Sequence, residues 1–169
     1  MLGRLGGLRL GAAPGAADRL AVEQAMARMG LERFRERPVS RMSGGERQLA
    51  AIARALAQQA RTLILDEPAA SLDFGNQGRV LDMLSALAAE GLGIVYSTHD
   101  PNHALRCGTQ ALLYLPAGEL AFGSVGDLIC ADRLSEAYGV KVEAARTADG
   151  RTVYTLAGPQ PAAGEQLSA

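Results

Sequence analysis

The chain has 169 residues, which suits one domain, and its 17 Lys and Arg residues against 18 Asp and Glu residues leave a net charge of −1. This balance argues against a protein that holds nucleic acid by bulk charge, and a hydrophobic share of 48% is too high for a disordered chain. No apolar stretch approaches the roughly 20 residues of a membrane span, and two distant cysteines, Cys107 and Cys130, argue against a disulfide framework or a zinc site.

The first helix is expected over residues 18–30, after an opening stretch rich in Gly and Ala that suggests a loop. Asp18 suits the N-cap. Apolar residues then recur at the spacing of one helical face, namely Val22, Ala25, Met26 and Met29. Residues 31–42 contain four arginines and a proline, and they suggest a short linker with a charged surface.

A second helix is expected from Ser43 to about Gln59. Ser43 and Glu46 have the spacing of a capping box, in which each side chain caps a backbone N–H of the other residue. Capping alone would explain both residues. The glycines at positions 44 and 45 also allow a ligand to approach the backbone closely, and the N–H groups of a helix start favour an anion.

A strand–helix–strand unit follows. Residues 62–65 form a short apolar run, typical of a strand buried on both faces, and a second such run covers residues 94–97. The helix between them is expected over residues 75–90, with its apolar face formed by Leu81, Leu84, Leu87 and Ala88. The unit is expected to be parallel with a right-handed crossover, so both strands end at the same edge of the sheet.

Polar residues stand at both of these strand ends. Asp66 and Glu67 follow the first strand and His99 follows the second, so the three are expected to lie close together. A magnesium-nucleotide site needs such acids, one to hold Mg²⁺ through water and one to orient the attacking water. A polar turn and an edge histidine are the simpler alternatives. His103 is assigned no role.

The remaining residues predict further hairpins and helices. Residues 111–115 and 118–122 suggest a hairpin, residues 124–138 suggest helix, and strands are expected near 140–145 and 151–156 on either side of an Asp-Gly turn. Residues 157–169 suggest a flexible tail.

Four motifs in order resemble the second half of an ATP-binding cassette (ABC) ATPase. They are Ser43–Gln48, Leu63–Pro68, Ser71-Leu72-Asp73 and His99. Each motif is weak alone, but the ordered set is specific. The resemblance implies an α/β fold, namely the C-terminal portion of a P-loop NTPase domain, with a parallel sheet flanked by helices and part of the helical subdomain.

The resemblance also implies roles for single residues. Asp66 corresponds to the Walker B acid that holds Mg²⁺ through water, Glu67 to the catalytic base and His99 to the switch histidine that senses the γ-phosphate of ATP. Asp73 belongs to the D-loop. The ABC signature, which completes the ATP site of the opposite subunit in trans, comprises Ser43, Gly44, Gly45 and Glu46 after Met42.

The domain organisation implied is a partial ABC ATPase domain over residues 1–156. Within it, residues 1–42 are the remnant of the helical subdomain, residues 43–110 run from the signature to the switch histidine, and residues 111–156 supply the C-terminal strands and helix. The segments STHDPNHAL and LSEAYGVKV, together with the opening Met1–Arg4, resemble importers of metal chelates such as iron–siderophore, haem, cobalamin or molybdate.

The function implied is that of the ATPase subunit of such an importer, at the cytoplasmic face of the cell membrane. Its partners would be membrane permease subunits, a second ATPase subunit and, indirectly, a solute-binding protein, with no nucleic acid. A soluble ABC ATPase of translation or DNA repair and a degenerate, non-catalytic subunit are the alternatives.

One departure from the family pattern is severe. The chain has no G-x-x-x-x-G-K-[ST] motif, and its only lysine is Lys141, far beyond the signature. The resemblance therefore implies an N-terminally truncated subunit, or a gene model begun at an internal start codon, in which the Walker A loop and the Q-loop would precede Met1.

The chain alone is expected neither to bind Mg-ATP tightly nor to hydrolyse it. Phosphate binding in this class needs a glycine-rich loop whose N–H groups hold the phosphates, with a lysine that reaches the β- and γ-oxygens. The measurement is calorimetric titration of the purified chain with Mg-ATP, together with a phosphate-release assay. Micromolar binding with steady turnover would contradict the expectation.

Overall fold

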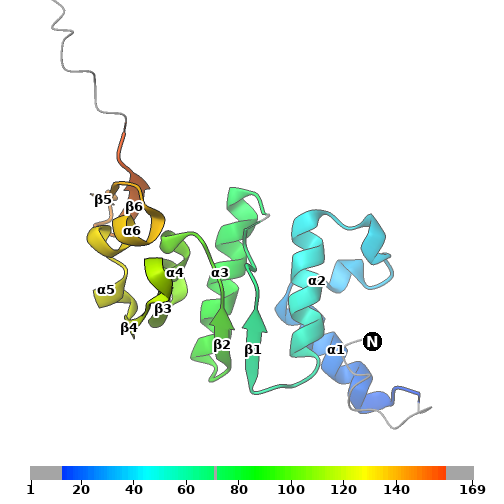
Figure 1. Cartoon of the computed structure of the whole chain (residues 1–169). Coiled ribbons are helices and arrows are strands. Elements are labelled where there is room, and N and C mark those ends of the chain that lie inside the picture. Colours follow the sequence, from blue (N-terminus) through cyan, green and yellow to red (C-terminus); the bar gives the residue numbers. More distant parts are fainter. Residues whose placement is uncertain (1–12, 71, 159–169) are drawn as a thin grey trace, which may run out of the picture. The chain divides into compact units, whose positions relative to one another are not determined.

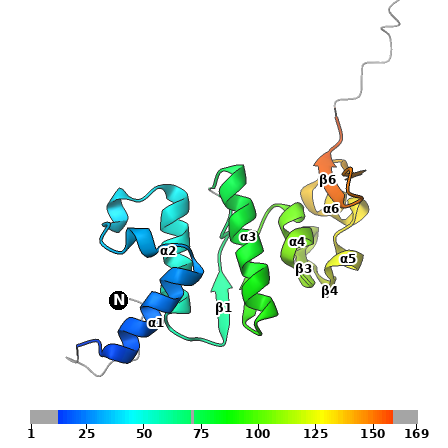
Figure 2. The ribbon, with the colours of Figure 1, turned by 180° about the vertical axis from the view of Figure 1, so that it is seen from behind.

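The computed structural model describes residues 13–70 and 72–158, and the chain divides into two compact units, residues 1–99 and 100–169. The first unit contains α1 (Ala16–Arg28), α2 (Gly44–Leu56), β1 (Thr62–Leu65), α3 (Phe74–Ala89) and β2 (Gly93–Tyr96), with short 3₁₀ turns at Glu32–Phe34 and Val39–Arg41 (Figures 1 and 2). Met1–Arg4, Ser71 and most of the expected tail lie outside the described residues.

Helix α1 begins earlier than expected. Gly15 is its N-cap, and Asp18 stands in the first turn, where its carboxylate accepts a hydrogen bond from the Gly15 N–H at 2.9 Å. The prediction that Asp18 is the N-cap was therefore wrong, because the acid caps from inside the helix. Gly30, at φ +62°, ends the helix as expected, and the Leu31 N–H donates to the Met26 carbonyl at 2.9 Å.

The segment expected as a charged linker takes part in the core. Its apolar residues Leu31, Phe34 and Met42 are buried, and its four arginines are all exposed at the surface. The guanidinium groups of Arg33 and Arg37 lie 4.6 and 5.6 Å from the centre of the Phe34 ring. The segment thus fixes the chain between α1 and α2.

The core of the first unit joins helices α1, α2 and α3. Helix α2 contributes Ile52 and Ala53 from the apolar face that the sequence predicts, and it ends three residues before the expected Gln59. The cluster is completed by the buried residues Ala25, Met29, Leu31, Phe34, Met42, Ala57, Leu72, Val80, Leu84 and Leu87. Burial of these side chains is the main term that holds the three helices together.

Strands β1 and β2 pair in parallel, with Leu63 opposite Ile94 and Ile64 opposite Val95. The expectation that both faces of this sheet are buried was wrong within the described residues. Leu63 is 4% exposed, whereas Ile64 and Val95 on the other face are 82% and 59% exposed. Successive side chains alternate between the faces of a strand, so here one face packs on the core and the other is open.

The second unit holds α4 (Pro101–Cys107), a hairpin of β3 (Gln110–Tyr114) and β4 (Leu120–Ser124), and a hairpin of β5 (Val142–Arg146) and β6 (Thr152–Leu156). Both hairpins agree with the sequence. The helix expected over residues 124–138 is two helices, α5 (Val125–Leu128) and α6 (Ala131–Tyr138), because Ile129 has a non-helical backbone and Cys130 an extended one.

The side chain of Asn102 joins α4 to β6. It donates to the Tyr154 carbonyl at 3.0 Å and accepts from the Tyr154 N–H at 2.8 Å. Val125, Ile129, Leu134 and Val142 form the core of this unit. Across the part of the chain that the structure describes, none of the helices has the length and apolar character needed to cross a membrane.

Ile52→Ala is expected to lower the free energy of unfolding by about 2–5 kcal/mol, because Ile52 is 1% exposed and its loss leaves a cavity. Ile64→Ala is the matched control. At 82% exposure it should cost less than about 1 kcal/mol. Urea unfolding followed by far-UV circular dichroism measures both values. Equal losses would show that Ile64 is covered in solution.

Candidate functional site

Polar residues gather where β1 and β2 end. Ser97 connects the two strand ends, because its hydroxyl donates to Asp66 Oδ1 at 2.5 Å and accepts from the Glu67 N–H at 2.9 Å. His99 lies beside them, with Nδ1 3.1 Å from Glu67 Oε1. The structure therefore brings together Asp66, Glu67 and His99, which the sequence expected to be neighbours. Ser97 was missed as a site residue, although its place at the end of an apolar strand was a usable signal.

The backbone at Glu67 is unusual. Its φ of +41° lies in the left-handed region, which is uncommon for a residue other than glycine. Such conformations persist where surrounding contacts hold them, and here the Glu67 N–H is fixed by Ser97. The side chains of Glu67 and His99 are 47% and 67% exposed, so both are accessible to a ligand from solvent.

The start of α2 is a complete capping box. Ser43 Oγ accepts from the Glu46 N–H at 3.3 Å, and the Ser43 N–H donates to Glu46 Oε2 at 2.8 Å. That second hydrogen bond holds the pKa of the Glu46 carboxyl below its ordinary value, and the nearby positive charge of Arg37 adds to the effect. Gly44 and Gly45 are the first helical residues, whose N–H groups have no acceptor within the helix.

The start of α3 is capped by Asp73. Its carboxylate accepts from the Asn76 N–H at 3.0 Å and from Asn76 Nδ2 at 2.5 Å. These hydrogen bonds, the backbone one first, keep the pKa of Asp73 below its ordinary value. Asp73 is therefore an N-cap as well as a candidate site residue. Asn76 was missed by the sequence analysis.

These features lie at the same end of the first unit. In Figure 1 the starts of α2 and α3 and the ends of both strands point the same way. Helix starts offer N–H groups to anions, and the strand ends offer carboxylate oxygens. The arrangement can therefore receive a phosphate group together with a cation.

The donor set fits one cation in particular. Asp66 and Glu67 supply carboxylate oxygens, and Mg²⁺ takes one or two of these while phosphate oxygens and water fill its other positions. No group of three or more His, Cys, Asp or Glu side chains gathers into a metal site among the described residues. The residues present fit Mg²⁺ that arrives with a phosphate ligand better than they fit a metal centre made of protein alone.

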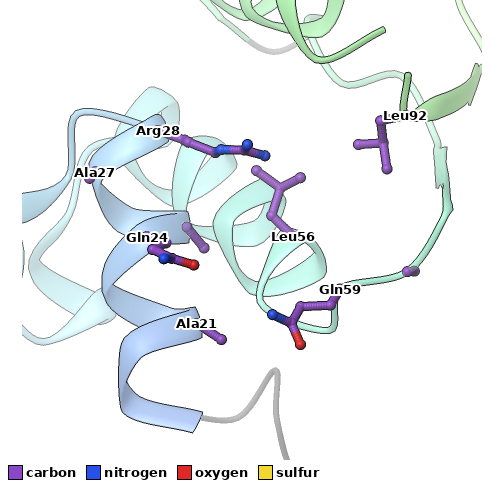
Figure 3. A pocket seen from close by; sticks show the side chains of 9 residues that line it. Ala21, Gln24, Ala27, Arg28, Leu56, Gln59 and Leu92 are labelled. Carbon is purple, nitrogen blue, oxygen red and sulfur yellow. The ribbon is translucent and has the colours of Figure 1, made fainter. Parts of the chain in front are cut away.

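A hollow of about 570 Å³ lies away from these residues. It is bounded by α1, the end of α2 and the loop before β2, and Figure 3 shows Arg28, Leu56 and Leu92 around it. Arg28 forms an ion pair with Glu90 at 2.7 Å nearby. None of the residues expected at the site lines this hollow.

Known ABC transporter sequences are similar to this chain. The sequence model of a family described as ABC transporter matches residues 9–70. An uncharacterized ABC transporter ATP-binding protein of Haemophilus influenzae is 35% identical over 143 residues, which are 85% of this chain and 54% of the relative. The hemin import ATP-binding protein HmuV of Burkholderia ambifaria is 35% identical, over 89% of this chain and 59% of the relative.

A relative with a different printed cargo also matches. The molybdenum import ATP-binding protein ModC of Aromatoleum aromaticum is 39% identical, over 69% of this chain and 31% of the relative. The chain thus spans between 31% and 59% of the length of these three curated relatives.

Solved structures agree on the fold. A protein described as a metal-chelate type ABC transporter, in an inward-facing conformation, superposes with a TM-score of 0.86 at 27% identity, over 93% of this chain and 64% of that one. The dimeric bacterial ABC transporter cassette MJ0796 superposes with a TM-score of 0.52 at 32% identity, over 62% of this chain and 45% of that one. The fold is that of the ABC ATPase domain of P-loop NTPases.

Glu46→Gln is expected to flatten the pH dependence of stability. The folded pKa of Glu46 lies below its ordinary value of 4.5, so its contribution is present above about pH 4.5 and is lost as the pH falls through the folded pKa. The difference in urea midpoint between the wild-type chain and the variant should therefore be largest near neutral pH and shrink in acid. Glu36→Gln, which removes an exposed carboxylate, is the control. A difference that stays constant down to acid pH would contradict the capping role.

Proposed function

Because the chain belongs to the ABC transporter family of ATP-binding proteins, we propose that it binds and hydrolyses ATP as the energy-supplying subunit of an importer. One observation carries the proposal. Asp66 and Glu67 stand together at the end of β1, and Ser97 and His99 at the end of β2 hold them by hydrogen bonds. Carboxylates placed in this way can hold Mg²⁺ through water and orient the attacking water, which are two of the parts that hydrolysis of a magnesium nucleotide requires.

Each residue at the strand ends has a separate task in this proposal. Asp66 holds Mg²⁺ through water, and the Ser97 hydroxyl fixes one of its oxygens. Glu67 orients the attacking water and accepts its proton, and His99 positions the Glu67 carboxylate through Nδ1 and contacts the γ-phosphate. Mg²⁺, when bound, neutralises charge on the phosphate oxygens.

The start of α2 serves a second subunit in this proposal. Ser43, Gly44, Gly45 and Glu46 form the signature, which approaches ATP held mainly by the partner. The N–H groups at the helix start suit the γ-phosphate, and Asp73 lies beside this contact as part of the D-loop. The dimeric form of the cassette MJ0796 supports a paired arrangement.

The proposed cargo is a metal chelate, iron–siderophore or a related compound. The hemin relative and the metal-chelate type structure support this class, while the molybdenum relative shows that cargo varies within the family. Membrane permease subunits would be direct partners and a solute-binding protein an indirect one. The subunit would then lie at the cytoplasmic face of the cell membrane.

The proposed division of the chain follows from its resemblance to the ABC ATPase domain. Residues 1–42 belong to the helical subdomain, residues 43–110 carry the signature and the strand-end residues, and residues 111–156 form the C-terminal strands and helix of one partial ATPase domain. The core that joins α1 to α2 supports placing both helices in one body.

A degenerate subunit that lends its signature to a partner is the second candidate. The sequence has no Gly-rich loop with lysine, and its single lysine, Lys141, is 72% exposed and forms an ion pair with Glu143 at 2.9 Å. The natural assembly is the complex that this chain forms in its own cell. Turnover is expected in that assembly.

Glu67→Gln in the natural assembly is expected to keep ATP binding and to lower turnover on the order of 10²–10³-fold, because one positioned catalytic group is lost. ATP binding is measured by titration and turnover by phosphate release. Glu119→Gln, an exposed carboxylate in the second unit, is the control and should keep full turnover. Near-normal turnover in Glu67→Gln would remove Glu67 from the catalytic role.

A further inference from the structure

Asn76, in the first turn of α3, holds both oxygens of the Asp73 carboxylate. Its backbone N–H donates to Oδ1 at 3.0 Å and its side-chain Nδ2 donates to Oδ2 at 2.5 Å. Hydrogen bonds to an ionised carboxylate are about twice as strong as neutral ones. The side-chain amide of Asn76 is therefore held in one orientation by the residue that caps its own helix.

The other side of the Asn76 side chain meets the start of α2. A β-carbon added to Gly45 would lie 3.0 Å from Asn76 Nδ2, 3.2 Å from Cγ and 3.5 Å from Cβ. Gly45 is buried and helical, so glycine is needed here for space and not for backbone conformation. A β-carbon on the neighbouring Gly44 would meet nothing within 4 Å.

The two contacts of Asn76 are linked. A methyl group at position 45 fits only if the Asn76 side chain moves by a few tenths of an ångström, and Asn76 cannot move freely while its amide is bonded to Asp73. A shift of the start of α2 therefore shifts the Asp73 carboxylate. In the same way, a shift of that carboxylate shifts the start of α2. The starts of α2 and α3 are thus linked by one chain of contacts, which runs through Gly45, Asn76 and Asp73.

We propose that Asn76 is a positioning residue that fixes the start of α2 relative to Asp73, so that the signature and the D-loop approach the partner's ATP as one rigid piece. The inference rests on the proposed function and adds to it a residue that neither touches ATP nor belongs to the four motifs. Positioning matters here because a misplacement on the order of 1 Å can cost about 10²-fold in rate.

The test combines two substitutions in the natural assembly, with turnover and KM for ATP as readouts. Gly45→Ala is expected to lower kcat on the order of tenfold while KM changes little, because the helix start is displaced. Asn76→Ala removes the obstacle. In that background, Gly45→Ala should lower kcat by less than about twofold, which is a strong departure from additivity. Arg79→Ala, at an exposed position of α3, is the control.

Thermal unfolding of the chain alone separates structure from function. Gly45→Ala should lower Tm, Gly44→Ala should not, and Asn76→Ala should reduce the effect of Gly45→Ala. Equal losses of kcat from Gly45→Ala in both backgrounds would overturn the inference. A loss of kcat that disappears after correction for the folded fraction would overturn it as well. Absence of turnover in the wild-type assembly, with the Tm coupling intact, would instead refute the proposed function and leave the steric connection standing.

Discussion

The parallel pairing of β1 with β2 is the constraint on which the candidate site depends. Leu65 lies opposite Tyr96, so the chain leaves both strands at the same edge of the sheet. Residues that are 30 positions apart in the sequence, Glu67 and Ser97, therefore come within hydrogen-bond distance. The pairing turns two polar strand ends into one group of side chains, and the packing of Leu65 and Ile94 against the helical core holds that group in place.

Two helix starts complete the arrangement, and each is fixed by its own cap. The capping box of Ser43 and Glu46 defines where α2 begins, and the Asp73 cap does the same for α3. Such caps stabilise a helix by providing acceptors for N–H groups that have none within it. Their larger effect is geometric, because they fix which N–H groups face a ligand, and Asn76 then joins the two starts through Gly45.

Local signals in the sequence predicted much of this architecture. The capping box, the Asp-Gly hairpin and the apolar strands depend on neighbouring residues, so they could be recognised directly. Asp18 was assigned to the wrong cap position because an acid can cap a helix from its first turn as well as from its start. The strands were expected to be buried on both faces, but burial depends on what covers a face, and Ile64 shows that one face is open among the described residues.

Two residues of the site region could not be found from the sequence, and for the same reason. Ser97 and Asn76 act through contacts with Asp66 and Gly45, which lie about thirty positions away in the sequence, and a single chain without its fold does not reveal such pairs. The family resemblance supplied roles for motif residues only. The structure identifies the residues that support those motif residues. A substitution at a supporting residue can therefore affect the site although it lies outside the motifs.

In the proposed dimer, the strand ends of one subunit and the α2 start of another meet on one ATP molecule. The most direct measurement is a high-resolution structure of the Glu67→Gln natural assembly with bound Mg-ATP. In that structure, Asp66 is expected to face the metal, and Ser43 from a second copy of the chain is expected to lie within hydrogen-bond distance of the γ-phosphate. Bound ATP that contacts neither the strand ends nor any α2 start would contradict it.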